Sequence, residues 1–306
     1  MAFGNLLTVE FSVCFSVVLM DNKRTAMEQI NARRYFIRIE PVRGWLTLGL
    51  QELWEFKSLL LILAMREVRL RYNQTFLGIV WVALQPLAAA VVFAVLFGRL
   101  ARLMPDDQPI LLYALGGLLP WMFHASAVQR ASMSFIQDAR LISKVYFPRI
   151  ILPLAQVFSV IIDYVVGLGV LILLGHIFDW PTGWRYSVLP VILILSTILA
   201  SGLGILWGAL SVFYRDFIHI LPFFLQIWMY SSPIVFSQEL IPERWRGAYA
   251  ILNPMVGIIE SLRWVFWGKG GFPFFEFGVS VIFSGIMFLA GALILRRVER
   301  QFSDVI

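Results

Sequence analysis

Residues 141–174 read LISKVYFPR followed by IILPLAQVFSVIIDYVVGLGVLILL, and the second part contains a single charge, Asp163. A helix that crosses the hydrocarbon core of a bilayer needs about 20 mostly apolar residues. The run over 150–174 is long enough to span, and it is entered from a basic and aromatic segment of the kind found at membrane surfaces. This stretch predicts an integral membrane protein. Its spans are expected to be helical, because a helix satisfies its own backbone hydrogen bonds in lipid.

The composition supports a membrane protein and excludes several other classes. Of the 306 residues, 59% are hydrophobic and only 14% are charged, whereas soluble domains carry about 25% charged residues. Cys14 is the single cysteine, and the three histidines are widely spaced, so no disulfide or metal site is predicted. The sequence lacks a GxxxxGK[ST] motif, so we expect no nucleotide or other cofactor to be bound by this chain.

Six segments are apolar enough to cross a membrane. Lys and Arg concentrate on the cytoplasmic side of membrane proteins, and 18 of the 25 lie in segments that are cytoplasmic if the N-terminus is inside. This bias predicts cytoplasmic N- and C-termini, and it accounts for the net charge of +6 without nucleic-acid binding. We expect a tail over 1–40 that is poorly ordered in part, an interfacial region over 41–76, a membrane domain over 77–300 and a cytoplasmic tail over 301–306. The predicted spans are 77–97, 110–128, 150–174, 188–213, 217–236 and 277–295.

The segment before the first span has a different pattern. Over 50–73, Leu53, Phe56, Leu60 and Leu63 recur at helical spacing, and charged residues alternate with apolar ones toward the end. This pattern is typical of a helix in the cytoplasmic interface whose basic residues face lipid headgroups. The alternative is a solvated basic linker. The charged candidates in this segment are Arg66, Glu67, Arg69 and Arg71.

A second amphipathic segment covers residues 135–148, between the second and third spans. Its apolar residues fall on one face at helical spacing and its polar residues on the other, and Pro148 is expected to end the helix. One interpretation is an interfacial anchor, and the other is a docking element that a cytoplasmic protein grips. The residues proposed for docking are Asp138, Arg140, Ser143, Lys144 and Tyr146.

Three further features are candidates for function. Asp163 is either a proton carrier or, as the absence of a second embedded acid or Lys favours, a hydrogen-bond anchor between helices. Rings within the spans either pack or line a path for sugars, which stack on aromatic faces; the candidates are Trp121, Phe123, Trp228 and Tyr230. The outer segment 238–273 contains three Trp and predicts one or two short helices that dip into the membrane. Its candidate residues are Asn253, Glu260 and Arg263.

Six blocks in order carry a resemblance to a known family over about residues 40–300. The chain resembles the membrane subunit of type-2 ABC exporters for bacterial surface polysaccharide, the Wzm/TagG-like permeases of O-antigen, capsule and teichoic-acid export. The blocks are PVRGWLTLGLQELWEF (41–56), REVRLRYNQTFLGIVWVALQP (66–86), LGGLLPWMFHASAVQRAS (115–132), LISKVYFPRIILPLA (141–155), YRDFIHILPFFLQIWMYSSPIVF (214–236) and NPMVGIIESLRW (253–264).

The resemblance implies a permease in the bacterial inner membrane rather than an enzyme. Two copies would form a channel for a lipid-linked polysaccharide, most closely O-antigen. Each copy would pair with a separate ATPase subunit that binds ATP and Mg²⁺. Segment 135–148 would be the coupling helix, 52–73 the gate helix and 238–273 the re-entrant outer helices. The alternatives are export of teichoic acid, capsule, or another lipid or drug, and, from another class, a membrane-embedded transferase or a proton-driven flippase.

Overall fold

The computed structural model describes residues 50–73, 78–103, 109–178, 180, 183–234, 236–268 and 270–299. Every regular element in these residues is helical, and none of them forms a strand. This confirms the predicted all-α class. The predicted tails over 1–40 and 301–306, and the first part of the interfacial region, lie outside the described residues.

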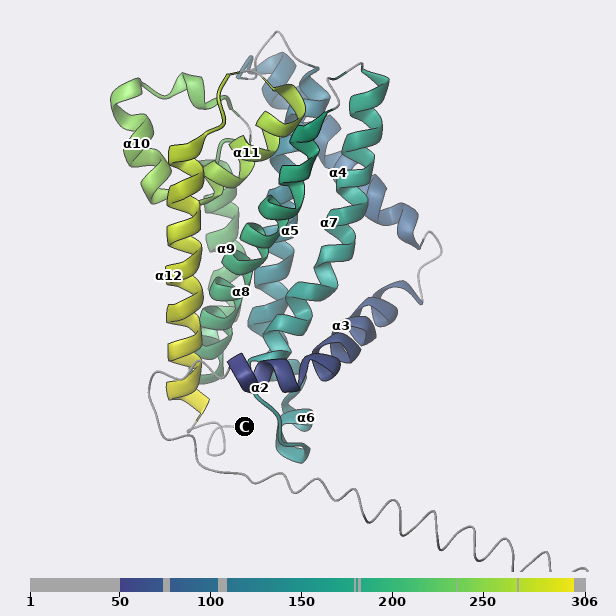
Figure 1. Ribbon diagram of the computed structural model, residues 1–306, viewed down its shortest axis with the longest axis vertical. Helices are drawn as coiled ribbons and strands as arrows, with labels where there is room; N and C mark the ends of the chain where they lie inside the picture. Colours follow the sequence, from purple (N-terminus) through teal and green to yellow (C-terminus); the bar gives the residue numbers. More distant parts are fainter. Residues whose placement is uncertain are drawn as a thin grey trace, which may run out of the picture. The chain divides into compact units, whose positions relative to one another are not determined.

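The helices form one bundle with short helices at both of its ends (Figure 1). Short 3₁₀ turns cover Trp184–Val188 and Gln238–Leu240. The π-helical segment Ala94–Leu100 directly continues α4. The α-helices are α2 (Leu50–Glu55), α3 (Lys57–Tyr72), α4 (Ile79–Phe93), α5 (Ile110–Gln137), α6 (Ala139–Lys144), α7 (Ile151–Ile177), α8 (Leu189–Phe213), α9 (Asp216–Ser231), α10 (Glu243–Leu252), α11 (Met255–Trp267) and α12 (Phe274–Glu299).

Five of the six predicted spans coincide with helices that are long and apolar enough to cross a membrane. They are Val80–Leu100, Ile110–Gln137, Ile151–Ile177, Trp184–Phe213 and Phe274–Val298. The predicted fifth span, 217–236, coincides with α9, which has 16 residues and ends at Ser231. At 1.5 Å per residue α9 is about 24 Å long, slightly less than the roughly 30 Å of a hydrocarbon core. The backbone of Ser232, directly after the helix, is extended.

The core of the bundle lies around α5, which packs against α7 and α8. Most of the side chains of α5 are buried, including Leu112, Phe135 and the Gly116–Gly117 pair. On the other side, α8 packs against α12 at glycine positions. A Cβ on Gly202 would lie 2.5 Å from the backbone nitrogen of Phe288, so only glycine permits this approach. Small residues at helix crossings are a common means of close packing in membranes.

The predicted amphipathic helix over 135–148 is wrong in its bounds. Helix α5 continues to Gln137, because Phe135 is fully buried against Gly208 and still belongs to the span. The chain then turns at Asp138, and α6 covers only residues 139–144. Val145 is already extended, so the helix ends before Pro148. Pro148 directly restricts only the residue before it, Phe147, so the extended backbone at Val145 is not explained by the proline.

The short helices lie at opposite ends of the bundle (Figure 1). Helix α6 is at the end where α2 and the start of α3 lie, while α10 and α11 are at the other end, together with the 3₁₀ turn at Trp184. Helix α3 crosses the bundle obliquely and packs on α7. The expected pair of short helices over 238–273 is therefore present. Helix α11 is the more buried of the two, and it ends at Gly268 in a left-handed conformation.

Candidate functional site

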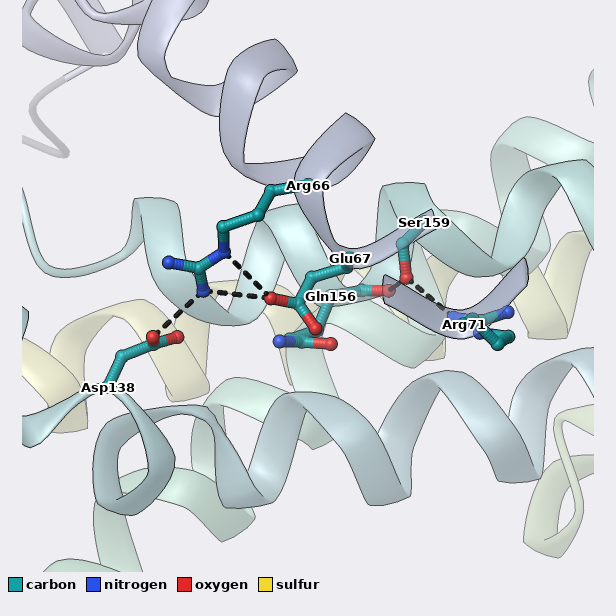
Figure 2. Close-up of polar contacts among 6 residues, drawn as sticks. All are labelled: Arg66, Glu67, Arg71, Asp138, Gln156 and Ser159. Atoms are coloured by element: carbon teal, nitrogen blue, oxygen red, sulfur yellow. Dashed lines mark hydrogen bonds and ion pairs between the residues drawn. The ribbon is translucent and has the colours of Figure 1, made fainter. Parts of the chain in front are cut away.

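Arg66 joins α3 to the junction of α5 and α6 (Figure 2). Its guanidinium donates to Glu67 Oε1 from Nε at 3.2 Å and from Nη2 at 2.8 Å, and Nη2 also lies 2.9 Å from Asp138 Oδ1. Asp138 is the residue at which the chain passes from α5 into α6. The ion pair therefore connects the predicted gate helix to the base of the predicted docking segment. We call the Arg66–Asp138 pair the junction pair.

A second set of contacts joins the far end of α3 to α7. Arg71 forms an ion pair with Asp163, and the Tyr72 hydroxyl donates a hydrogen bond to the same carboxylate. Arg71 Nη2 also donates to Ser159 Oγ at 3.0 Å (Figure 2). We call Arg71, Tyr72 and Asp163 the α3–α7 latch. Burial, followed by the hydrogen bond to Asp163, raises the pKa of Tyr72 to about 12.

The latch changes how both charged segments are interpreted. The sequence pattern predicted that the basic residues of 50–73 face lipid headgroups. This is wrong for Arg66, which pairs with Asp138 between α5 and α6, and for Arg71, which pairs with Asp163 of α7. Arg69 is exposed, as expected for a headgroup contact. Asp163 has a positive partner, so the geometry favours an anchor between helices over a proton carrier. The sequence signal that could have found this partner is the basic cluster itself, which ends next to the first span.

Helix α6 and the residues that follow it expose polar side chains, and one apolar side chain attaches the segment to the bundle. Arg140 and Lys144 are exposed, and Tyr146 is 61% exposed. Phe147, by contrast, is buried at 5% and packs with Phe135, which fixes the segment to the bundle. The side chain of Ser143 lies outside the described residues. The arrangement fits a rigid projection with a charged surface.

The aromatic candidates separate into buried and accessible rings. Trp121 and Phe123 are each 3% exposed in the core. Trp121 packs edge-on against Trp228 with ring centroids 5.7 Å apart. Tyr230 on α9 is 52% exposed. Packing therefore accounts for Trp121 and Phe123, and Tyr230 is the candidate that an extended ligand can reach.

Asn253 ties the end of α9 to the turn between α10 and α11. Its Oδ1 accepts from Trp228 Nε1 at 2.8 Å and from the Met255 amide at 3.1 Å. Its Nδ2 donates to the Ser231 carbonyl at 3.2 Å and to Ser232 Oγ at 3.0 Å. Both ends of the amide are thus satisfied at a site that is 5% exposed.

Asn253→Ala should lower the thermal stability of the purified chain. Trp228 Nε1 and the Met255 amide would lose their acceptor, which costs about 1–3 kcal/mol for each buried donor. The apparent melting temperature in detergent, followed by size-exclusion chromatography after heating, should fall by several degrees. Asn73→Ala, at an exposed amide that follows α3, is the matched control and should not shift it. Equal shifts in the two variants would contradict the anchoring role of Asn253.

The other outer candidates form a buried ion pair against α5. Arg263 Nη1 donates to Glu260 Oε1 at 2.8 Å, and its guanidinium lies 3.8 Å from the centre of the Tyr113 ring. Only 5% of the Arg263 side chain is exposed. A Cβ on Gly117 would lie 3.0 Å from Arg263 Nη2, so this glycine makes room for the guanidinium. Burial raises the pKa of Glu260, and the charge of Arg263 opposes that shift.

Comparison with known proteins gives a consistent set of relatives. The model of the ABC-2 type transporter family matches residues 58–267, which include α3 through α11. An O-antigen export system permease protein from Myxococcus xanthus is 29% identical over 71% of this chain and 83% of its own length. One from Klebsiella pneumoniae is 26% identical over 81% of this chain and 95% of its own length. A polysialic acid transport protein from Escherichia coli is 26% identical over 66% of this chain and 78% of its own length.

Proposed function

We propose that this chain, which belongs to the ABC-2 type transporter family, is the membrane permease of an exporter that moves a lipid-linked surface polysaccharide. The observation that carries the proposal is the match over 83% and 95% of the length of two relatives described as O-antigen export permeases. A more distant relative is described as transporting polysialic acid. O-antigen is therefore the first substrate we propose, and capsular polysaccharide is the second.

As a member of this family, the chain is a multi-pass transport protein and not itself an enzyme. ATP would be bound and hydrolysed, with Mg²⁺, by a separate cytoplasmic subunit. We place two such subunits under two copies of this chain in the bacterial inner membrane, with both termini cytoplasmic. The excess of Lys and Arg in the segments that the sequence predicts to be cytoplasmic supports this orientation. No nucleic acid is involved.

The coupling route starts at α6. The exposed side chains of Arg140, Lys144 and Tyr146 would contact the ATPase subunit. Movement of α6 would act on Asp138 at its base and then, through the junction pair, on Arg66 of α3. The latch, about one and a half turns further along α3, would pass the movement on to α7. Helix α3 is thus attached to the rest of the chain at two places. The junction pair lies near the proposed ATPase contact, and the latch lies within the bundle.

The outer end of the bundle would act as the exit. Helices α10 and α11 are fixed to α9 by Asn253 and to α5 by the Glu260–Arg263 pair. When the exit opens, α10 and α11 would therefore have to move together with α9 and α5, or these contacts would have to rearrange. Tyr230, which is half exposed on α9, would contact the sugar chain during passage. Rings bind sugar faces weakly enough for a polymer to slide.

Lys144→Glu should abolish or strongly reduce export while the chain still inserts in the membrane. Reversing this exposed charge would oppose the contact that we propose with the ATPase subunit. The measurements are surface polysaccharide on intact cells and the amount of ATPase subunit that co-purifies with the tagged permease. Deleting residues 138–146 should have the same effect on both.

Arg297→Glu is the control for Lys144→Glu. It reverses an exposed charge at the α6 end of the bundle, near the end of α12. This control should export normally. Co-purification of the ATPase at wild-type levels with the 138–146 deletion would contradict the docking role of α6.

A further inference from the structure

A cavity of about 250 Å³ lies between α3, α4, α5 and α7. The latch forms part of its wall, because Arg71, Tyr72 and Asp163 all line it. Arg130 of α5 and Tyr164 of α7 line it as well. The cavity therefore combines charged and polar groups with apolar side chains of the surrounding helices.

The charges around the cavity do not balance. Its wall carries two guanidinium groups, of Arg71 and Arg130, and one carboxylate, of Asp163. Asp163 is already engaged by Arg71 and Tyr72. Arg130 forms no hydrogen bond or ion pair with any residue that the structure describes, and the carboxylates of Asp163 and Glu67 act on it only at longer range. The lining thus has an excess of one positive charge, which favours an anionic ligand.

Three polar groups at the cavity can donate hydrogen bonds and have no acceptor among the described residues. Arg71 Nε is buried without a hydrogen-bond partner among the described residues. The Tyr164 hydroxyl is also buried without a partner in that part of the chain, and only 2% of this side chain is exposed. The guanidinium of Arg130 adds further donors and no acceptor. A ligand that satisfies them must present several acceptor oxygens, and phosphate does this best, since guanidinium groups bind it in bidentate fashion.

The surroundings favour a phosphate that is attached to a lipid. Trp81 lines the cavity and is 52% exposed, and the neighbouring Val80 is 57% exposed. Both belong to the first span, Val80–Leu100, so these apolar side chains continue from the cavity onto the membrane-facing surface. An acyl or prenyl chain can lie along this surface while its phosphate enters the cavity.

We propose that this cavity binds the phosphate or diphosphate group of a lipid-linked substrate, with Arg71 and Arg130 as its ligands. Arrival of the phosphate replaces Asp163 as the partner of Arg71. The latch between α3 and α7 is thereby loosened when substrate is present. The assignment of the lipid as transported substrate rests on the proposed function, whereas the anion site rests on the cavity alone.

The test measures binding to the purified full-length chain in nanodiscs by native mass spectrometry. The probes are a polyprenyl diphosphate, the polyprenol of the same chain length and inorganic pyrophosphate. The diphosphate lipid should bind, and inorganic pyrophosphate should compete with it. The polyprenol should bind at least tenfold more weakly, because it lacks the charge-assisted hydrogen bonds. Equal binding of polyprenol and diphosphate would overturn the site.

Variants identify the residues. Arg130→Gln should weaken diphosphate binding about tenfold or more, as expected for a lost charge-assisted contact. It should fold normally, since Arg130 has no ion pair to lose. Asp163→Asn should strengthen binding, because it removes the anion that competes for Arg71. Arg69→Gln, which changes an exposed cation of α3 outside the cavity, should bind like the unmodified chain.

Two outcomes separate this inference from the exporter proposal. Unchanged binding in Arg130→Gln overturns the anion site and leaves the exporter proposal standing. Lost binding in Arg130→Gln together with normal export of surface polysaccharide supports the anion site, and it refutes the assignment of its ligand as the transported substrate. Binding of inorganic pyrophosphate as tight as that of the lipid would overturn the lipid as the source of the phosphate.

Discussion

Asp163→Asn is expected to reduce polysaccharide export at least tenfold while the chain inserts normally. The substitution removes the negative charge that holds Arg71 and Tyr72 of α3 against α7. Breaking one partner of a buried ion pair costs roughly 3–5 kcal/mol. Because the Arg71 and Asp163 side chains keep 18% and 28% exposure, we expect a smaller loss of about 1–3 kcal/mol in the free energy of unfolding. Surface polysaccharide and thermal stability in detergent are the measurements.

A double variant separates the latch from a general effect of the substitution. Arg71→Gln should destabilise the chain when made alone. Combined with Asp163→Asn it should destabilise the chain less than the sum of the two, because the second change removes the unpaired charge that the first one leaves. Asp216→Asn, at an exposed acid in the first turn of α9, is the control and should have little effect. Additive losses in the double variant would contradict direct pairing.

Charge reversal at the junction pair should uncouple transport from ATP hydrolysis without destabilising the chain. Arg66 is 40% exposed, so its pair with Asp138 contributes less than about 1 kcal/mol to the free energy of unfolding. Its importance in our account is mechanical, because it is the contact between α3 and the base of α6. Arg66→Asp or Asp138→Arg alone should stop export, measured with the partner ATPase present, and leave thermal stability nearly unchanged.

The swapped variant is the decisive control for the junction pair. Arg66→Asp combined with Asp138→Arg restores an attractive pair in reversed order, and it should recover part of the export that each single change removes. Arg69→Glu reverses an exposed charge on the same helix that makes no ion pair with the described residues, and it should export normally. A swapped variant as inactive as the singles would contradict a role for this pair in coupling.

The spans and their order could be predicted from the sequence, because hydrophobic length alone identifies them. The bounds of α5 and α6 could not. Phe135 looks like one face of an amphipathic helix in the sequence, but it is a core residue because Gly208 of α8 leaves space for its ring. That space is a tertiary contact between residues far apart in the sequence. The same applies to α9, whose end depends on hydrogen bonds of Asn253 to Ser231 and Ser232.

The sequence predicted several residues of the candidate site, but it did not predict which of them contact one another. Arg71 and Asp163 were each singled out, yet they are 92 positions apart and a single sequence contains no sign that they meet. For the aromatic candidates, the sequence could not predict which rings are buried. Trp121 and Tyr230 are both aromatic residues within predicted spans, but the Trp121 side chain is buried in the structure and the Tyr230 side chain is exposed. Arg130 was not singled out, because a lone Arg near the end of a span is ordinarily explained by the positive-inside rule.

The central claim is that movement of α6 reaches α3 through Arg66 and Asp138. The most direct measurement is the distance between spin labels on Arg69 of α3 and Leu293 of α12, both exposed positions, recorded by pulsed electron resonance. Labelled chain is diluted with unlabelled chain and assembled with the partner ATPase. We predict that ATP binding changes this distance in the unmodified chain and leaves it unchanged in Asp138→Arg. An identical change in both, with the ATPase still bound, would contradict the account.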